Sequence, residues 1–416
     1  MEMAVKFKTI NIHKVLFTLA IFLYLYMPPI IPVNTIYLIG ALGWGYILLN
    51  GGVISKEFAK KFLDFIGIAI YVVIVGYIKT GGLITSMAGL FYLAFFGIPA
   101  ALSVGLYAMK HKFTIEDLIK IIAWAATLQG ILSIFSYLFY GVQSFFVGRF
   151  YLVMDSAMVD HLRNKRLYGW ANGMTYGMPV VQGVIGIIVL IYALKKEKRY
   201  LILVPIIWLA GIFNARTSIL IILLGLVIVL LENGLLNWKR LFQLLLIVIF
   251  GVVVLNLVLK RSSNTNSSAW LSSGINEIVA FLKGKNIGYF ALLHSNTDTS
   301  IGITTFPSGN ELWFGTGELV RSDIGYVRDM WEGGILYCLL LYSLFLSMIK
   351  KIFLSLIVIT RKRTSFFICI FFVVVMIIAN IKGSIFGLNE LALFLILTYF
   401  SLTLYNKNGV LKKYNE

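Results

Sequence analysis

The stretch 178–232 decides the fold class: it reads MPVVQGVIGIIVLIYAL, KKEKR, YLILVPIIWLAGIFN, AR and TSILIILLGLVIVLLE in succession. Three apolar runs follow one another here, separated only by a basic turn at 195–199 and by the pair Ala215-Arg216. A helix that crosses a bilayer needs about 20 mostly apolar residues, which is close to the length of each run with its flanks. The stretch therefore predicts consecutive membrane-spanning helices joined by tight turns.

The composition of the whole chain points the same way. Of its 416 residues, 59% are hydrophobic and only 13% are charged, and the mean hydropathy is +0.89. Soluble domains carry about 25% charged residues, so the chain is predicted to be a polytopic membrane protein. We expect an all-α fold in which residues 1–416 form one integral membrane domain with about twelve transmembrane helices. The expected spans are 14–32, 35–52, 62–78, 83–109, 119–140, 178–194, 200–214, 217–232, 241–259, 333–350, 365–381 and 391–405.

The charges indicate how these spans are oriented. Lys and Arg number 36 against 18 Asp and Glu, and the basic residues are scattered between apolar runs rather than gathered on a polar face. This distribution argues against nucleic acid as a partner. With the N-terminus inside, 23 of the 36 basic residues fall on the cytoplasmic side, as the positive-inside rule requires of short loops. Both termini are therefore predicted to be cytoplasmic.

Two non-cytoplasmic loops, 141–177 and 260–332, are too long to be simple connectors. Long loops in compact proteins usually carry function, and we expect the second one to form a small helical cap over the membrane domain. The spans themselves contain almost no ionisable residue, whereas pumps and symporters place acids or His at mid-membrane depth. The chemistry is thus predicted to lie in these outer loops and at their junctions with the membrane.

Four arginines, Arg166, Arg216, Arg321 and Arg328, lie at or near the predicted outer interface. A guanidinium binds phosphate oxygens in a bidentate manner and stays charged in any environment, which suits a diphosphate at the level of the lipid headgroups. Simpler roles remain open for two of them. The basic cluster that ends in Arg166 could contact anionic headgroups, and Arg216 could snorkel to the surface or cap the helix that follows it.

Three short stretches resemble one family. They are Phe314-Gly315-Thr316-Gly317 with Ser322-Asp323-Ile324-Gly325-Tyr326-Val327 and Glu332-Gly333-Gly334-Ile335-Leu336, then Arg216-Thr217-Ser218, and finally Arg166-Leu167-Tyr168-Gly169-Trp170-Ala171-Asn172-Gly173. Together with the topology, they resemble the superfamily of O-antigen polymerases (Wzy) and O-antigen ligases. In the ligase branch a His occupies the position of Asp323, so the aspartate favours a polymerase.

The resemblance implies a fold of the GT-C class, with periplasmic loops over a cavity that opens to the bilayer of the bacterial inner membrane. It implies a metal-independent glycosyl transfer, without a cofactor, from an oligosaccharide linked to undecaprenyl diphosphate. The polymers in question are O-antigen (lipopolysaccharide) or capsule repeat units, and the expected partners are membrane lipids, a chain-length regulator and a flippase. A ligase of the same fold and a lipid-linked oligosaccharide flippase are the alternatives, although a flippase should show a charged internal cavity and related halves.

The residues fit that chemistry. A departing diphosphate needs stabilisation of its negative charge, which the arginines can supply. An acceptor hydroxyl needs a base within hydrogen-bond reach, and Asp323 is the first candidate and Glu332 the second. Asp323 could instead pair with a neighbouring arginine or cap the next helix, and Glu332 could be an interface residue in the first turn of that helix.

Overall fold

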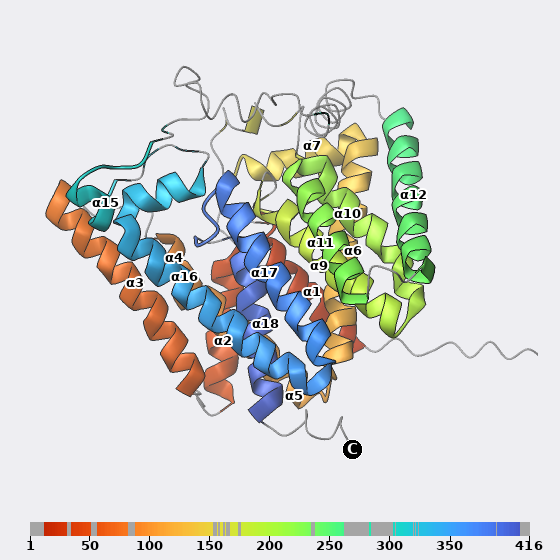
Figure 1. Cartoon of the computed structure of the whole chain (residues 1–416), viewed down its shortest axis with the longest axis horizontal. Helices are drawn as coiled ribbons and strands as arrows, with labels where there is room; N and C mark the ends of the chain where they lie inside the picture. Colours follow the sequence, from red (N-terminus) through yellow and green to blue (C-terminus); the bar gives the residue numbers. More distant parts are fainter. Residues whose placement is uncertain are drawn as a thin grey trace, which may run out of the picture.

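The computed structural model consists of packed helices (Figure 1), and most of them are apolar. Among the described residues, six of them, in α3, α4 to α5, α6, α9, α16 and α17, are long and apolar enough to cross a membrane, and five shorter apolar helices accompany them. The chain is therefore a helical membrane protein. The residues that the structure describes are 12–30, 35–50, 56–81, 88–152, 156, 159–160, 163, 167–173, 176–233, 238–261, 283, 303, 305–318, 320, 322, 324–387 and 389–407.

Each of the twelve predicted runs overlaps a helix of the structure, whereas the number of spans stays a prediction. The helices are α1 (Ile12–Tyr26), α2 (Thr35–Leu49), α3 (Lys56–Thr80), α4 (Ala88–Tyr92), the π-helical turn η2 (Leu93–Gly97), α5 (Ile98–Lys110), α6 (Ile115–Leu138), α7 (Tyr140–Phe150), α9 (Gly177–Lys195), the 3₁₀ turn η3 (Lys198–Ile202), α10 (Leu203–Asn214), α11 (Thr217–Asn233), α12 (Trp238–Arg261), α15 (Asn310–Phe314), α16 (Gly325–Ile359), α17 (Lys362–Lys382) and α18 (Glu390–Lys407).

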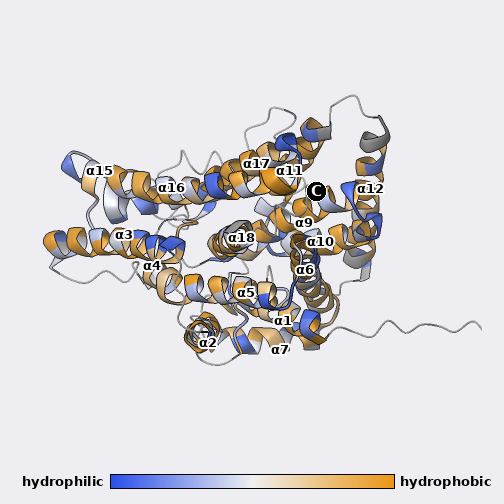
Figure 2. Ribbon diagram, turned by 90° about the horizontal axis from the view of Figure 1, so that it is seen from below, coloured by the Kyte–Doolittle hydropathy of each residue, from blue (hydrophilic) through white to orange (hydrophobic). Residues whose placement is uncertain are grey.

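The centre and the periphery of the helix bundle differ in what their apolar side chains contact. Helix α9 is apolar on all sides and almost wholly buried, because α6, α10, α11 and α18 pack around it. A helix of that kind belongs in a core. Helix α12 stands at the edge and exposes side chains such as Phe242, Leu246 and Phe250, and Figure 2 shows hydrophobic residues along the outward sides of the peripheral helices. Such an outer surface suits lipid rather than water.

Ion pairs fasten helix ends at the predicted cytoplasmic side, where the basic turn 195–199 lies. Lys120 of α6 contacts Glu197 of that turn, and Lys195 at the end of α9 contacts Glu232 of α11. The hydrogen bond from Lys120 lowers the pKa of Glu197 to about 2, so this carboxylate stays ionised at neutral pH. The basic turn 195–199, which was used to predict the cytoplasmic side, therefore also connects helices through its ion pairs.

Helix α16 contains the feature that matters most for the site. Gly334 has φ 68° and ψ −167°, which no helix allows, so the helix bends there. We call its first nine residues, Gly325–Gly333, upper α16; in Figure 1 they lie across the upper part of the bundle before the rest of α16 descends. The predicted span began at residue 333, so this prediction missed both the helical turns that precede Gly334 and the bend itself.

The structure describes parts of the two long loops. The first begins with α7 and closes with a segment, 167–173, that is packed onto the helices. In the second, the described residues include α15 and the turn Phe314-Gly315-Thr316-Gly317. Most of the predicted helical cap lies outside the described residues.

Candidate functional site

The turn 314–317 packs directly against upper α16. The backbone N–H and the hydroxyl of Thr316 both donate to the carbonyl oxygen of Trp331, at 2.8 and 3.1 Å. A Cβ added to Gly315 would lie 2.6 Å from the Cα atom of Gly333, and one added to Gly334 would lie 2.4 Å from the carbonyl carbon of Trp313. Only glycines allow two backbones to approach so closely. The structure thus brings together two of the stretches, 314–317 and 332–336, on which the family resemblance rests.

Upper α16 carries the ion pair of the site. Arg328 donates from Nε to Oε1 of Glu332 at 2.9 Å, one helical turn away. The Glu332 side chain is 6% exposed and that of Arg328 is 39% exposed. A guanidinium has five N–H donors, so Arg328 can keep this bond and still bind a phosphate oxygen from the exposed side. Glu332 is better placed to orient Arg328 than to take a proton from a substrate.

The segment 167–173 is fixed to the helices beside Arg216. The backbone N–H of Tyr168 donates to Oδ1 of Asn214 at 3.0 Å, and Nδ2 of Asn214 donates to the carbonyl oxygen of Tyr168 at 2.8 Å. The Ser133 hydroxyl donates to the same carbonyl at 3.0 Å. Asn214 ends α10, and the half-buried Arg216 follows in the turn before α11. This turn and the loop segment, which the sequence had singled out separately, therefore adjoin.

Of the predicted site residues, the structure describes Arg216, Arg328 and Glu332. It pairs Arg328 with Glu332, and it places Arg216 two residues after Asn214, which is bonded to Tyr168 of segment 167–173. Arg166, Arg321 and Asp323 lie outside the described residues, so their roles stay predictions.

Two buried carboxyl groups were not selected from the sequence. Asp329 in upper α16 is fully buried, and its Oδ2 accepts from Nδ2 of Asn380 in α17 at 2.9 Å. Glu390 at the start of α18 is also fully buried, and its Oε1 accepts from the backbone N–H of Gly173 at 2.6 Å. The other oxygen of each carboxylate has no hydrogen-bond partner among the described residues. The only signal in the sequence was an acid at or a few residues before the start of an apolar run.

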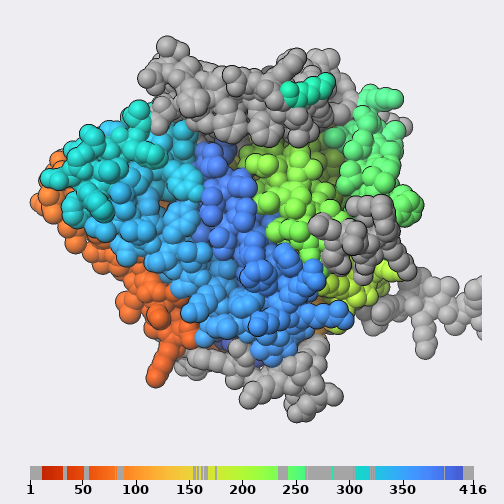
Figure 3. All heavy atoms as spheres, viewed as in Figure 1, coloured from red at the N-terminus to blue at the C-terminus, as the bar shows by residue number. Residues whose placement is uncertain are grey.

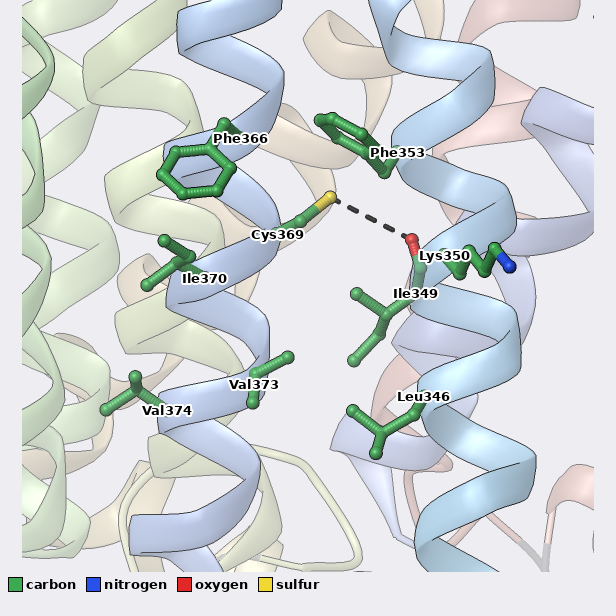
Figure 4. Close-up of a pocket in the computed structure, with 9 residues that line it drawn as sticks. All are labelled: Leu346, Ile349, Lys350, Phe353, Phe366, Cys369, Ile370, Val373 and Val374. Carbon is green, nitrogen blue, oxygen red and sulfur yellow. Dashed lines mark hydrogen bonds between the residues drawn. The ribbon is translucent and has the colours of Figure 1, made fainter.

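Within the described residues, no group of three or more His, Cys, Asp or Glu side chains could hold a metal ion. A groove of ≈ 400 Å³ runs between α16 and α17, and Figure 4 shows Phe353 and Phe366 facing each other across it. Its lining is apolar apart from Lys350 and Cys369. It lies towards the connection between the two helices, away from upper α16, and contains none of the predicted site residues.

Comparisons with known proteins add no relative. No family model, no curated protein and no solved structure matches the chain. Its function therefore has to be inferred from the residues of the site themselves.

Proposed function

We propose that the chain is a membrane glycosyltransferase that polymerises repeat units carried on undecaprenyl diphosphate. It would transfer the growing glycan from its carrier to a repeat unit on a second carrier. We further propose that it spans the bacterial inner membrane about twelve times, with cytoplasmic termini and periplasmic long loops. The observation that carries this proposal is the packing of turn 314–317 on upper α16, because it gathers stretches of the family resemblance around the Arg328–Glu332 pair.

The roles follow from the chemistry of the residues. Arg328, oriented by Glu332, would bind the departing diphosphate, and Arg216 would bind the lipid diphosphate from the side of segment 167–173. Arginine suits this task because its planar fork matches phosphate oxygens and its charge stabilises the leaving group. Asp323 stays the proposed base for the acceptor hydroxyl.

The glycan profile of a deletion strain tests the proposal. Loss of a polymerase leaves single repeat units attached to the final acceptor, and the wild-type chain restores the ladder of long products. Loss of a ligase instead leaves no units attached, and loss of a flippase traps the units on the cytoplasmic leaflet. Either of the last two profiles contradicts the proposal.

A further inference from the structure

A chain of buried hydrogen bonds starts at Asp329 in upper α16. Asp329 accepts from Nδ2 of Asn380 at 2.9 Å, and Oδ1 of Asn380 accepts from the backbone N–H of Ile385 at 3.1 Å. Asp329 and Asn380 are both fully buried. The amide of Asn380 thus uses both its ends, one for upper α16 and one for the loop that follows α17.

The same chain continues to the first outer loop. The carbonyl oxygen of Ile385 accepts from Nδ2 of Asn389 at 2.6 Å. The next residue is Glu390, whose Oε1 accepts from the backbone N–H of Gly173 at 2.6 Å. The connection therefore runs from upper α16, which carries Arg328 and Glu332, to segment 167–173, which lies beside Arg216.

A tyrosine makes a second, parallel link. The hydroxyl of Tyr176, three residues beyond Gly173, donates to the carbonyl oxygens of Ala379 and Gly383 at the end of α17. Helices α16 and α17 lie side by side on one face of the molecule (Figure 3). Both ends of the hydrogen-bond chain are therefore held against the same helix end.

The two acids are costly residues for such a position. A buried carboxylate gives up its hydration, and each of these has one oxygen without a partner among the described residues. Neither Asp329 nor Glu390 is exposed, so neither can touch a substrate in this arrangement. What each does in the structure is accept a hydrogen bond from a group that belongs to another segment.

We propose that Asp329 and Glu390 are positioning residues that fix upper α16 and segment 167–173 relative to each other. The proposal rests on the proposed function, in which Arg328 on upper α16 and Arg216, in the turn beside segment 167–173, bind the lipid diphosphate. A shift of one element would change the distance between the two guanidinium groups, and a misplacement of about 1 Å can cost about 10²-fold in rate.

Leucine and amide variants separate positioning from proton transfer. Asp329→Leu and Glu390→Leu remove the acceptor oxygens, and each should lower polymerisation per molecule by about 10²-fold. Asp329→Asn and Glu390→Gln keep an acceptor oxygen at the same place, so they should retain most of the activity. An amide variant that is present at normal abundance yet inactive would show that the negative charge itself is needed, which overturns the positioning role.

The double variant tests whether the two residues act through one arrangement. If they do, Asp329→Leu with Glu390→Leu should be no worse than either single variant, whereas independent effects would multiply to about 10⁴-fold. Glu232→Leu is the matched control, because Glu232 is a buried acid at the opposite end of the bundle. When Glu232→Leu is combined with Asp329→Leu, the fold-losses in polymerisation of the two single variants should multiply. Multiplication in the Asp329 and Glu390 pair would refute the proposal.

Thermal unfolding of the purified full-length variants provides a readout that needs no activity. The loss in melting temperature for the double leucine variant should be smaller than the sum of the two single losses, while Asp329→Leu and Glu232→Leu should add. If the wild-type chain fails to restore long polymers in the deletion strain, the proposed function is refuted, but the structural coupling of Asp329 and Glu390 is not. If the losses in melting temperature of Asp329→Leu and Glu390→Leu add in the double variant, the two residues are not coupled, whatever the activity of the variants.

Discussion

The substitution Gly334→Ala tests the backbone packing on which the site depends. The φ of 68° and ψ of −167° at Gly334 lie in a region that is essentially restricted to glycine, and an alanine there costs about 1–3 kcal/mol. The new Cβ would also lie 2.4 Å from the carbonyl carbon of Trp313. Because that neighbour is backbone and cannot rotate away, overpacking adds about 1–3 kcal/mol. The two effects together predict a loss of roughly 2–6 kcal/mol.

Two control glycines separate these effects. Gly309 has φ 61° but no atom within 4 Å of an added Cβ, so Gly309→Ala should show the conformational cost alone. Gly67 lies in helix α3 with open space around it, and Gly67→Ala should be neutral or stabilising by about 1 kcal/mol. Thermal unfolding of the purified variants in detergent should rank Gly334→Ala as the least stable and Gly67→Ala as the most stable. If Gly334→Ala and Gly67→Ala have the same melting temperature, turn 314–317 does not pack on upper α16 as described.

Three further outcomes are expected. Arg216→Ala should abolish polymerisation at normal membrane abundance, and Arg216→Lys should rescue it poorly, because lysine lacks the bidentate fork; long glycan ladders in the alanine variant would remove Arg216 from the site. Asp323→Asn should stay in the membrane yet lose about 10²–10⁴-fold in rate, because an amide can cap a helix but cannot accept the proton; chains of ordinary length would make Asp323 structural. A cysteine at Ser322 should react with an impermeant thiol reagent from outside and one at Ser55 should not, and the reverse pattern would overturn the proposed topology.

The helices could be predicted from the sequence because apolar side chains must face either lipid or the protein interior. Hydropathy therefore identified a run at every major helix, including α10 and α11, which a single short turn separates. It missed α7, whose sequence YGVQSFFVGRF mixes aromatic and polar residues. It also missed upper α16, because RDMWE places three charges within five residues, and a scan for apolar runs stops at charges.

The site could be predicted only where its residues form a recognisable pattern with their neighbours in the sequence. Glycines that allow close approach, such as Gly315 and Gly334, form recognisable short patterns, and the structure brings them into contact. Asp329 and Glu390 gave no such pattern, because their partners are 51 residues away at Asn380 and 217 residues away at Gly173. Burial of an acid depends on contacts of that range, which no local pattern contains.

These two kinds of residue have complementary effects on one end of the molecule. The glycines let turn 314–317 lie against upper α16, but glycine contributes no side chain that could hold the bend in place. Rigidity must then come from other contacts. These include the bonds from Thr316 to the carbonyl oxygen of Trp331, from Asn380 to Asp329 and from Tyr71 to the carbonyl oxygen of Gly333. A bent helix held on both sides keeps Arg328 in one position relative to turn 314–317 and α17. Under the proposed function, Arg328 has to keep this place, because the energy with which a guanidinium binds a phosphate depends on its position.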